Sequence, residues 1–307
     1  MNDLRVAAVV MRSEFGEIES NLEKMGEFVR QAASENAEVI CFPEMSVTGY
    51  ALRDEIREIA EPVPGPSTRE VQRMADESNA MILAGLAERT GGDGVAITQV
   101  VALPSGDMRT YRKLHLSLGE QEYFQAGHET PVFRIGGTTF GVELCYDAHF
   151  PELSTILALK GAEVLFMPHA SPPPESSNEK RDRWLRYLSA RAYDNGVFVV
   201  ACNQAGEGGG GIRFAGVAMV LDPRGEVVAE TAGDEDGMIV ATLEAEALIR
   251  TRNTRMGFFL AHRRPELYEA LSAPMTDAII EQSRRRGGSY EGGAPDEARN
   301  AQVVSNS

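Results

Sequence analysis

The chain has 307 residues, of which 43% are hydrophobic and 25% are charged, a composition ordinary for a soluble globular protein. Its net charge of −16 disfavours a nucleic-acid partner, because a phosphate backbone requires a basic surface. The sequence contains no apolar run of about 18 residues, so we expect no membrane span. Three scattered cysteines exclude a disulfide framework or a zinc site, and the N-terminus lacks the features of a signal peptide, so we expect a cytoplasmic protein.

Apolar runs alternate with helix-like stretches along the first half of the chain. Residues 4–10 and 39–42 are expected to form buried strands, and residues 18–36 an amphipathic helix between them. After a loop rich in Pro and Gly, Ser67 is expected to cap a helix that runs to about residue 78. Residues 81–87 follow as a strand, and residues 95–103 and 107–111 as a hairpin.

The same alternation continues in the second half. We expect a hairpin of residues 132–135 and 139–144, helices over 151–160 and 180–194, strands over 164–167 and 197–202, and a last hairpin of 217–221 and 227–229. Crossovers mixed with hairpins imply α/β layers around buried sheets. We expect residues 1–282 to form one domain. From about residue 283 the composition shifts, and residues 283–307 are expected to be a tail that is mobile or packs on a partner subunit.

Three polar residues, Glu44, Lys113 and Cys145, stand where predicted strands stop. Side chains at such ends often line one ligand site beyond a sheet. A thiol at a strand-to-helix turn also points toward N–H groups that favour a thiolate. Each residue has an ordinary alternative: a solvated turn carboxylate, a surface lysine, or a small buried cysteine.

Together these residues lie in three motifs that resemble those of the nitrilase superfamily of carbon–nitrogen hydrolases. Segment 42–50, FPEMSVTGY, is similar to the glutamate motif, segment 111–116, YRKLHL, to the lysine motif, and segment 145–152, CYDAHFPE, to the cysteine motif. The order and spacing fit, and the similarity runs from about residue 4 to residue 268. The resemblance implies a four-layer α-β-β-α sandwich of the nitrilase type.

The resemblance also implies roles for the three residues. Glu44 would be the general base, Lys113 an electrostatic stabiliser and Cys145 a nucleophile that forms a thioester. The chemistry is consistent, because an ordinary thiol is weakly ionised at neutral pH and a nearby carboxylate can accept its proton. A second glutamate commonly joins this triad in the family, and by its distance from the following glycine Glu120 fits better than Glu122.

The residues around the cysteine indicate which bond is cleaved. Tyr146-Asp147 replaces the Trp-Glu usual in true nitrilases, so we expect a hydrolase of linear amides or N-carbamoyl compounds that releases ammonia. Tyr146, His149 and His169 are expected to contact the substrate. The alternatives are a nitrilase acting on a nitrile and a non-catalytic binding subunit. The resemblance further suggests a homodimer or larger homo-oligomer, and we expect no metal and no cofactor.

Overall fold

The computed structural model describes residues 1–104, 106–172, 175–209 and 211–274. Met1–Ala261 forms one compact unit, and the described residues 262–274 belong to a second. Within the second, Pro265–Leu267 and Glu269–Leu271 form short 3-10 helices. The expected tail, 283–307, lies outside the described residues, and the expected domain boundary at residue 282 stays a prediction.

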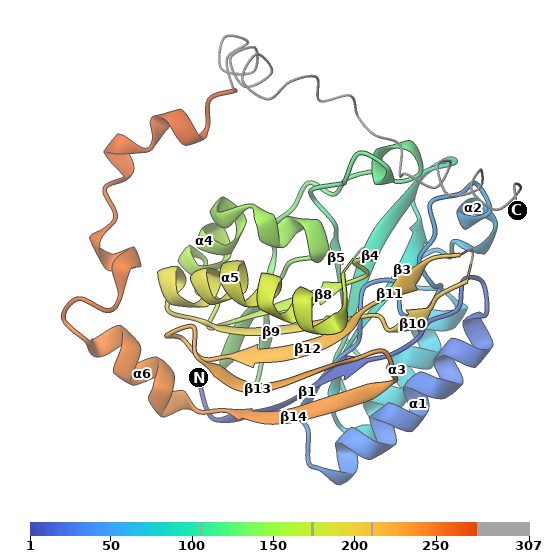
Figure 1. The fold of residues 1–307 in the computed structure, drawn as a ribbon, viewed down its shortest axis with the longest axis horizontal. Helices are drawn as coiled ribbons and strands as arrows, with labels where there is room; N and C mark the ends of the chain where they lie inside the picture. The colour runs from blue at the N-terminus through green and yellow to red at the C-terminus, as the bar shows by residue number, and fades with distance from the viewer. Residues whose placement is uncertain (105, 173–174, 210, 275–307) are drawn as a thin grey trace, which may run out of the picture. The chain divides into compact units, whose positions relative to one another are not determined.

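Two six-stranded sheets form the centre of the first unit (Figure 1). The first sheet has the order β14-β1-β2-β3-β4-β5, with bounds Gly237–Leu243, Leu4–Val10, Val39–Cys41, Met81–Arg89, Val95–Ala102 and Met108–Arg112. The second has the order β13-β12-β9-β8-β7-β6, with bounds Val227–Gly233, Gly216–Leu221, Phe198–Asn203, Val164–His169, Thr138–Val142 and Val132–Ile135. A small ribbon of β10 (Gly206–Glu207) and β11 (Arg213–Phe214) stands apart from both.

Six α-helices accompany the sheets in the described part of the first unit. They are α1 (Ile18–Ser34), α2 (Ile56–Ile59), α3 (Pro66–Ser78), α4 (Pro151–Leu159), α5 (Ser177–Asn195) and α6 (Ala245–Asn253). Two 3-10 helices matter for the site, η1 (Glu120–Glu122) and η2 (Cys145–His149). Figure 1 shows α1 and α3 beside the first sheet, and α4 and α5 over the second.

The alternation of side chains along the strands produces the layers. In β1, Val6 and Ala8 belong to a buried cluster shared with the second sheet, whereas Ala7 and Val9 pack with residues of α1 and α3. Residues on the outer face of the second sheet pack with α4 and α5, where Trp184 is fully buried. Because successive residues of a strand point to opposite faces, each sheet contacts the other sheet on one side and helices on the other. The fold is therefore the expected four-layer α-β-β-α sandwich.

Several predicted elements differ from the structure at their ends. Ser67 was expected to cap a helix, but it lies inside α3, because Pro66 takes the first helical position and Gly65 precedes it. Helix α5 begins three residues before residue 180, at a capping box in which Ser176 and Glu179 bond each other's backbone. Strand β14 and helix α6 were not predicted. Among the described residues, no helix is long and apolar enough to cross a bilayer.

Candidate active site

Lys113 is the centre of a buried charged cluster. Its Nζ donates to Oε1 of Glu44 at 2.8 Å and to Oε1 of Glu120 at 2.7 Å. The side chains of all three residues are at most 3% exposed. Tyr50 also donates to Glu120, at 3.1 Å, whereas Glu122 is exposed. The structure thus brings together Glu44, Lys113 and Glu120 and leaves Glu122 at the surface.

The topology explains why the residues meet. Strand β2 is parallel to β3, and β4 is antiparallel to both β3 and β5, so β2 and β5 run in the same direction. Glu44 follows β2 and Lys113 follows β5, so both residues lie where the carboxyl ends of these two strands meet, at the same end of the first sheet. Cys145 follows β7 in the second sheet. The site is therefore formed between two sheets. The positions of the residues at strand ends in the sequence do not indicate that two sheets take part.

The carboxylate of Glu44 is held from both sheets. Its Oε2 accepts the backbone N–H of Ala170 at 2.7 Å, just after β8, while Oε1 accepts from Lys113. The backbone carbonyl of Glu44 accepts the side-chain amide of Gln204 at 2.8 Å. These contacts leave the carboxylate little freedom to rotate, which fits a group that must face one proton donor.

Cys145 is the first residue of η2 and has φ of +47°, a left-handed conformation that is unusual for a residue with a side chain. Met45, directly after Glu44, has φ of +57°. Such conformations cost free energy and cluster at functional sites, where the surrounding structure holds them in place.

Asp147 fixes the turn that carries Cys145. Its fully buried carboxylate accepts the hydroxyl of Tyr111 at 2.7 Å, the backbone N–H of His115 at 2.8 Å and the backbone N–H of Leu144 at 3.0 Å. The ring of His115 also stacks on Phe150. Asp147 therefore connects the lysine segment to the cysteine turn, and His115 serves as structural support between them.

Burial and charge set the protonation of the site. Burial raises the pKa of the Cys145 thiol, and the charge of Glu44 raises it further. The expectation that helix N–H groups would favour a thiolate is therefore wrong for the resting site, because desolvation and two carboxylates outweigh them. Burial also raises the pKa of Glu44, which makes it a stronger base than a free carboxylate. For Lys113, burial works toward a lower pKa, but Glu44, Cys145 and Glu120 together raise it well above its ordinary value.

The three expected substrate contacts lie in different surroundings. Tyr146 is 39% exposed beside Cys145, and His149 is exposed on η2, with its ring 5.7 Å from that of Tyr146. His169 is 1% exposed and packs 4.1 Å from Trp184, and its Nδ1 bonds the carbonyl of Met167. Substrate contact by these residues stays a prediction.

Sequence reasoning gave no role to Tyr50, Ala170 or Gln204. Tyr50 ends the FPEMSVTGY motif, so its position was a usable signal. Ala170 acts through its backbone, and Gln204 follows β9 without a recognisable motif. For these two residues only the fold reveals the contact.

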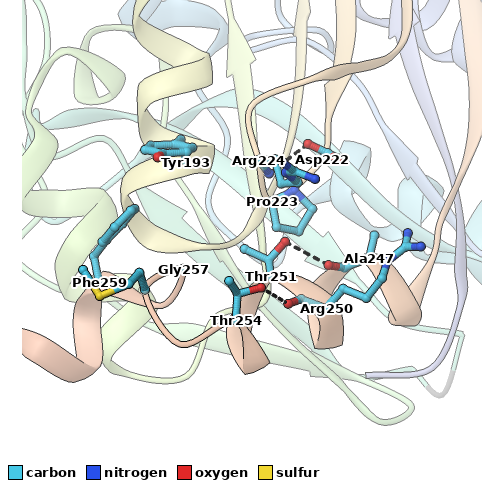
Figure 2. A pocket seen from close by; sticks show the side chains of 11 residues that line it. Tyr193, Asp222, Pro223, Arg224, Ala247, Arg250, Thr251, Thr254, Gly257 and Phe259 are labelled. Atoms are coloured by element: carbon cyan, nitrogen blue, oxygen red, sulfur yellow. Dashed lines mark hydrogen bonds between the residues drawn. The ribbon is translucent and has the colours of Figure 1, made fainter.

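A pocket of about 520 Å³ lies elsewhere, between the end of α5, the β12–β13 turn and α6 (Figure 2). Tyr193 and Phe259 form one side, and Thr251 and Thr254 bond back to carbonyls of their own helix. Its described lining contains no cysteine, histidine or lysine. Its described lining shares no residue with the cluster around Lys113 and offers no thiol nucleophile.

Comparison with known proteins identifies the family of the chain. The family model for carbon-nitrogen hydrolases matches residues 5–253. The chain belongs to the carbon-nitrogen hydrolase family. As a member of that family it is an enzyme that hydrolyses carbon–nitrogen bonds.

Curated relatives of this carbon-nitrogen hydrolase have different names. A protein named nitrilase from Pyrococcus abyssi is 31% identical over 269 residues, covering 86% of this chain and 99% of its own length. An N-carbamoylputrescine amidase from Solanum lycopersicum is 30% identical, covering 88% and 95%. A 2-oxoglutaramate amidase from Bacillus subtilis is 32% identical, covering 78% and 90%.

A solved structure supports the fold. A CN-hydrolase superfamily protein from Xanthomonas campestris superposes with a TM-score of 0.76 at 24% identity, covering 86% of this chain and 98% of its own.

Proposed function

We propose that this hydrolase cleaves a small linear amide or an N-carbamoyl compound through a thioester on Cys145. The observation that carries the proposal is the buried Lys113, bonded to both Glu44 and Glu120 beside a strained cysteine turn. The relatives named as amidases of N-carbamoylputrescine and 2-oxoglutaramate support this bond type.

In the first half-reaction Glu44 accepts the thiol proton as Sγ attacks the carbonyl carbon. The raised pKa of the buried thiol means that proton transfer accompanies attack rather than preceding it. The ammonium of Lys113 and the backbone N–H of Tyr146 stabilise the oxyanion of the tetrahedral intermediate. Glu44 then gives the proton to the leaving nitrogen, the C–N bond breaks, and ammonia departs.

In the second half-reaction water attacks the thioester. Glu44 accepts a proton from the water, the C–S bond breaks, and the proton returns to the sulfur as the acid leaves. For an N-carbamoyl substrate the acid is a carbamic acid, which loses carbon dioxide. Glu120, fixed by Lys113 and Tyr50, positions the substrate and supports proton movement.

The test is ammonia release over short amides, N-carbamoyl amines, N-carbamoyl amino acids and nitriles. We expect turnover of amides or carbamoyl compounds, and a loss of at least about a thousandfold in kcat for Cys145→Ala. Full ammonia release by Cys145→Ala would refute the mechanism.

A second candidate, nitrile hydrolysis, is favoured by the relative named nitrilase. It predicts that nitriles are converted to acids faster than the matching amides. A chain that binds these compounds without turning any over would instead be a binding subunit.

A further inference from the structure

One face of α5 borders the turn that carries the nucleophile. Lys180, Arg183 and Tyr187 follow one another at spacings of three and four, which places them on the same side of the helix. The ring of Tyr187 lies 4.6 Å from that of His149, four residues after Cys145 in η2. This face therefore lies beside η2, the turn that begins with Cys145.

The face carries two cations, which pair with one carboxylate, Glu175, just before the start of α5. Nε of Arg183 donates to both oxygens of Glu175 at 3.0 Å, and its Nη2 donates to Oε1 at 2.5 Å. Nζ of Lys180 lies 3.4 Å from the same Oε1 and donates to the carbonyl of Ser171 at 2.9 Å. Glu175 thus neutralises only one of the two cations.

The cluster around Lys113 has the opposite charge. There Glu44 and Glu120 share the cation Lys113, which leaves a net charge of −1, whereas Lys180, Arg183 and Glu175 together carry +1. The bond to Glu175 chiefly raises the pKa of Arg183, so the guanidinium stays charged. Burial lowers the pKa of His149, and it therefore adds no positive charge near pH 7.

We propose that Arg183 and Lys180 make this enzyme selective for amides and N-carbamoyl compounds whose far end carries a carboxylate, an inference that rests on the proposed function. The neutral amide meets the acidic cluster around Lys113, and the carboxylate of the substrate accepts from the guanidinium of Arg183. Lys180, whose side chain is fully buried, acts through its charge, which solvent screens little. A substrate with a cationic far end is repelled, because the carboxylate of Glu175 is already paired.

Binding to the Cys145→Ala variant tests the proposal without turnover. Calorimetry would compare glutaramate with pentanamide and 5-aminopentanamide, and N-carbamoyl-β-alanine with propylurea and 3-aminopropylurea. Within each set the chain length is similar and only the charge of the far end changes. We expect the carboxylate to bind about 10- to 100-fold more tightly than the neutral compound, and the cation most weakly. Equal affinities, tighter binding of the neutral or cationic compounds, or no binding of either carboxylate would overturn it.

Two further variants in the same background separate selectivity from a structural role. Arg183→Gln is expected to remove the advantage of the carboxylate, and Glu175→Gln to increase it, because the guanidinium loses its internal partner. Arg186→Gln, an exposed arginine on the same helix, is the matched control and should leave all affinities unchanged. A purely structural effect would weaken the three compounds alike. If the wild type hydrolyses pentanamide through Cys145 but shows no carboxylate preference, the proposed function stands and this inference fails.

Discussion

A Cβ atom on Gly85 would lie 2.2 Å from the backbone nitrogen of Met45, far inside contact distance. Gly85 sits in β3, and its N–H donates to Ser46 at 3.1 Å while its carbonyl accepts from Val47 at 2.8 Å. The segment that carries Glu44 therefore rests directly on the backbone of β3. The left-handed conformation of Met45 is held by this close approach.

Gly85→Ala should displace Glu44 from Lys113 and from the Cys145 thiol. Overpacking of a buried site costs about 1–3 kcal/mol, and a displacement of about 1 Å at a reacting group can cost about 100-fold in rate. We expect kcat for ammonia release to fall by about that factor and the urea midpoint to fall as well. Gly91→Ala is the control, because nothing lies within 4 Å of the added atom. Unchanged activity in Gly85→Ala would show that the glutamate segment does not need this contact.

Glu120 and Glu122 can be separated by paired substitutions. Glu120→Gln keeps a hydrogen-bond acceptor for Lys113 but removes a buried negative charge, so kcat/KM should fall by about 100-fold. Glu122→Gln changes an exposed side chain and should stay within about twofold of wild type. Thermal melts would check that both variants fold. A large loss in Glu122→Gln with none in Glu120→Gln would reverse the assignment.

The local part of this structure was predictable from sequence. Residues 4–10 were expected as a strand and form β1 with the same bounds, because an apolar run broken only by Arg5 specifies a strand buried on both faces. The predicted helix ends are wrong where more than one residue type can begin a helix. At the start of α3, Ser67 was expected as the cap, but Gly65 holds that position. Strand β14 was missed because several of its residues are only half buried, and its partner β1 is more than 200 residues away.

The site was predictable only as far as its motifs extend. Strand ends and motif order indicated Glu44, Lys113 and Cys145, and glycine spacing favoured Glu120 over Glu122. The direction of the thiol pKa could not be read from sequence, because it depends on desolvation and on carboxylates that come from another sheet. The support of Glu44 by Ala170 and Gln204 depends on tertiary contacts in the same way.

Glu143, two residues before the nucleophile, is a buried carboxyl group that the proposed mechanism does not use. It is 0% exposed, and neither of its side-chain oxygens has a hydrogen-bond partner among the described residues. Burial raises its pKa to about 8, and the charge of Asp147 contributes in the same direction, while the nearby hydroxyl of Ser154 and the charge of Arg191 oppose the shift. The folded protein therefore holds this proton at neutral pH.

This raised pKa makes stability depend on pH with a definite sign. Below about pH 4.5 the carboxyl is protonated in both states. Between about 4.5 and 8 the unfolded chain releases the proton and the folded chain retains it, so the free energy of unfolding falls by about 1.4 kcal/mol per pH unit from this group. Glu143→Gln removes the titration, so its stability relative to wild type should rise by about 3 kcal/mol between pH 5 and pH 7.5 and level off above pH 8. Urea unfolding across that range measures the difference, and any constant cost of the amide cancels from the trend. Glu152→Gln changes an exposed position in α4 and is the control, so its free energy of unfolding should vary with pH as that of wild type does. The same pH dependence in Glu143→Gln and wild type would mean that Glu143 is ionised in the folded protein.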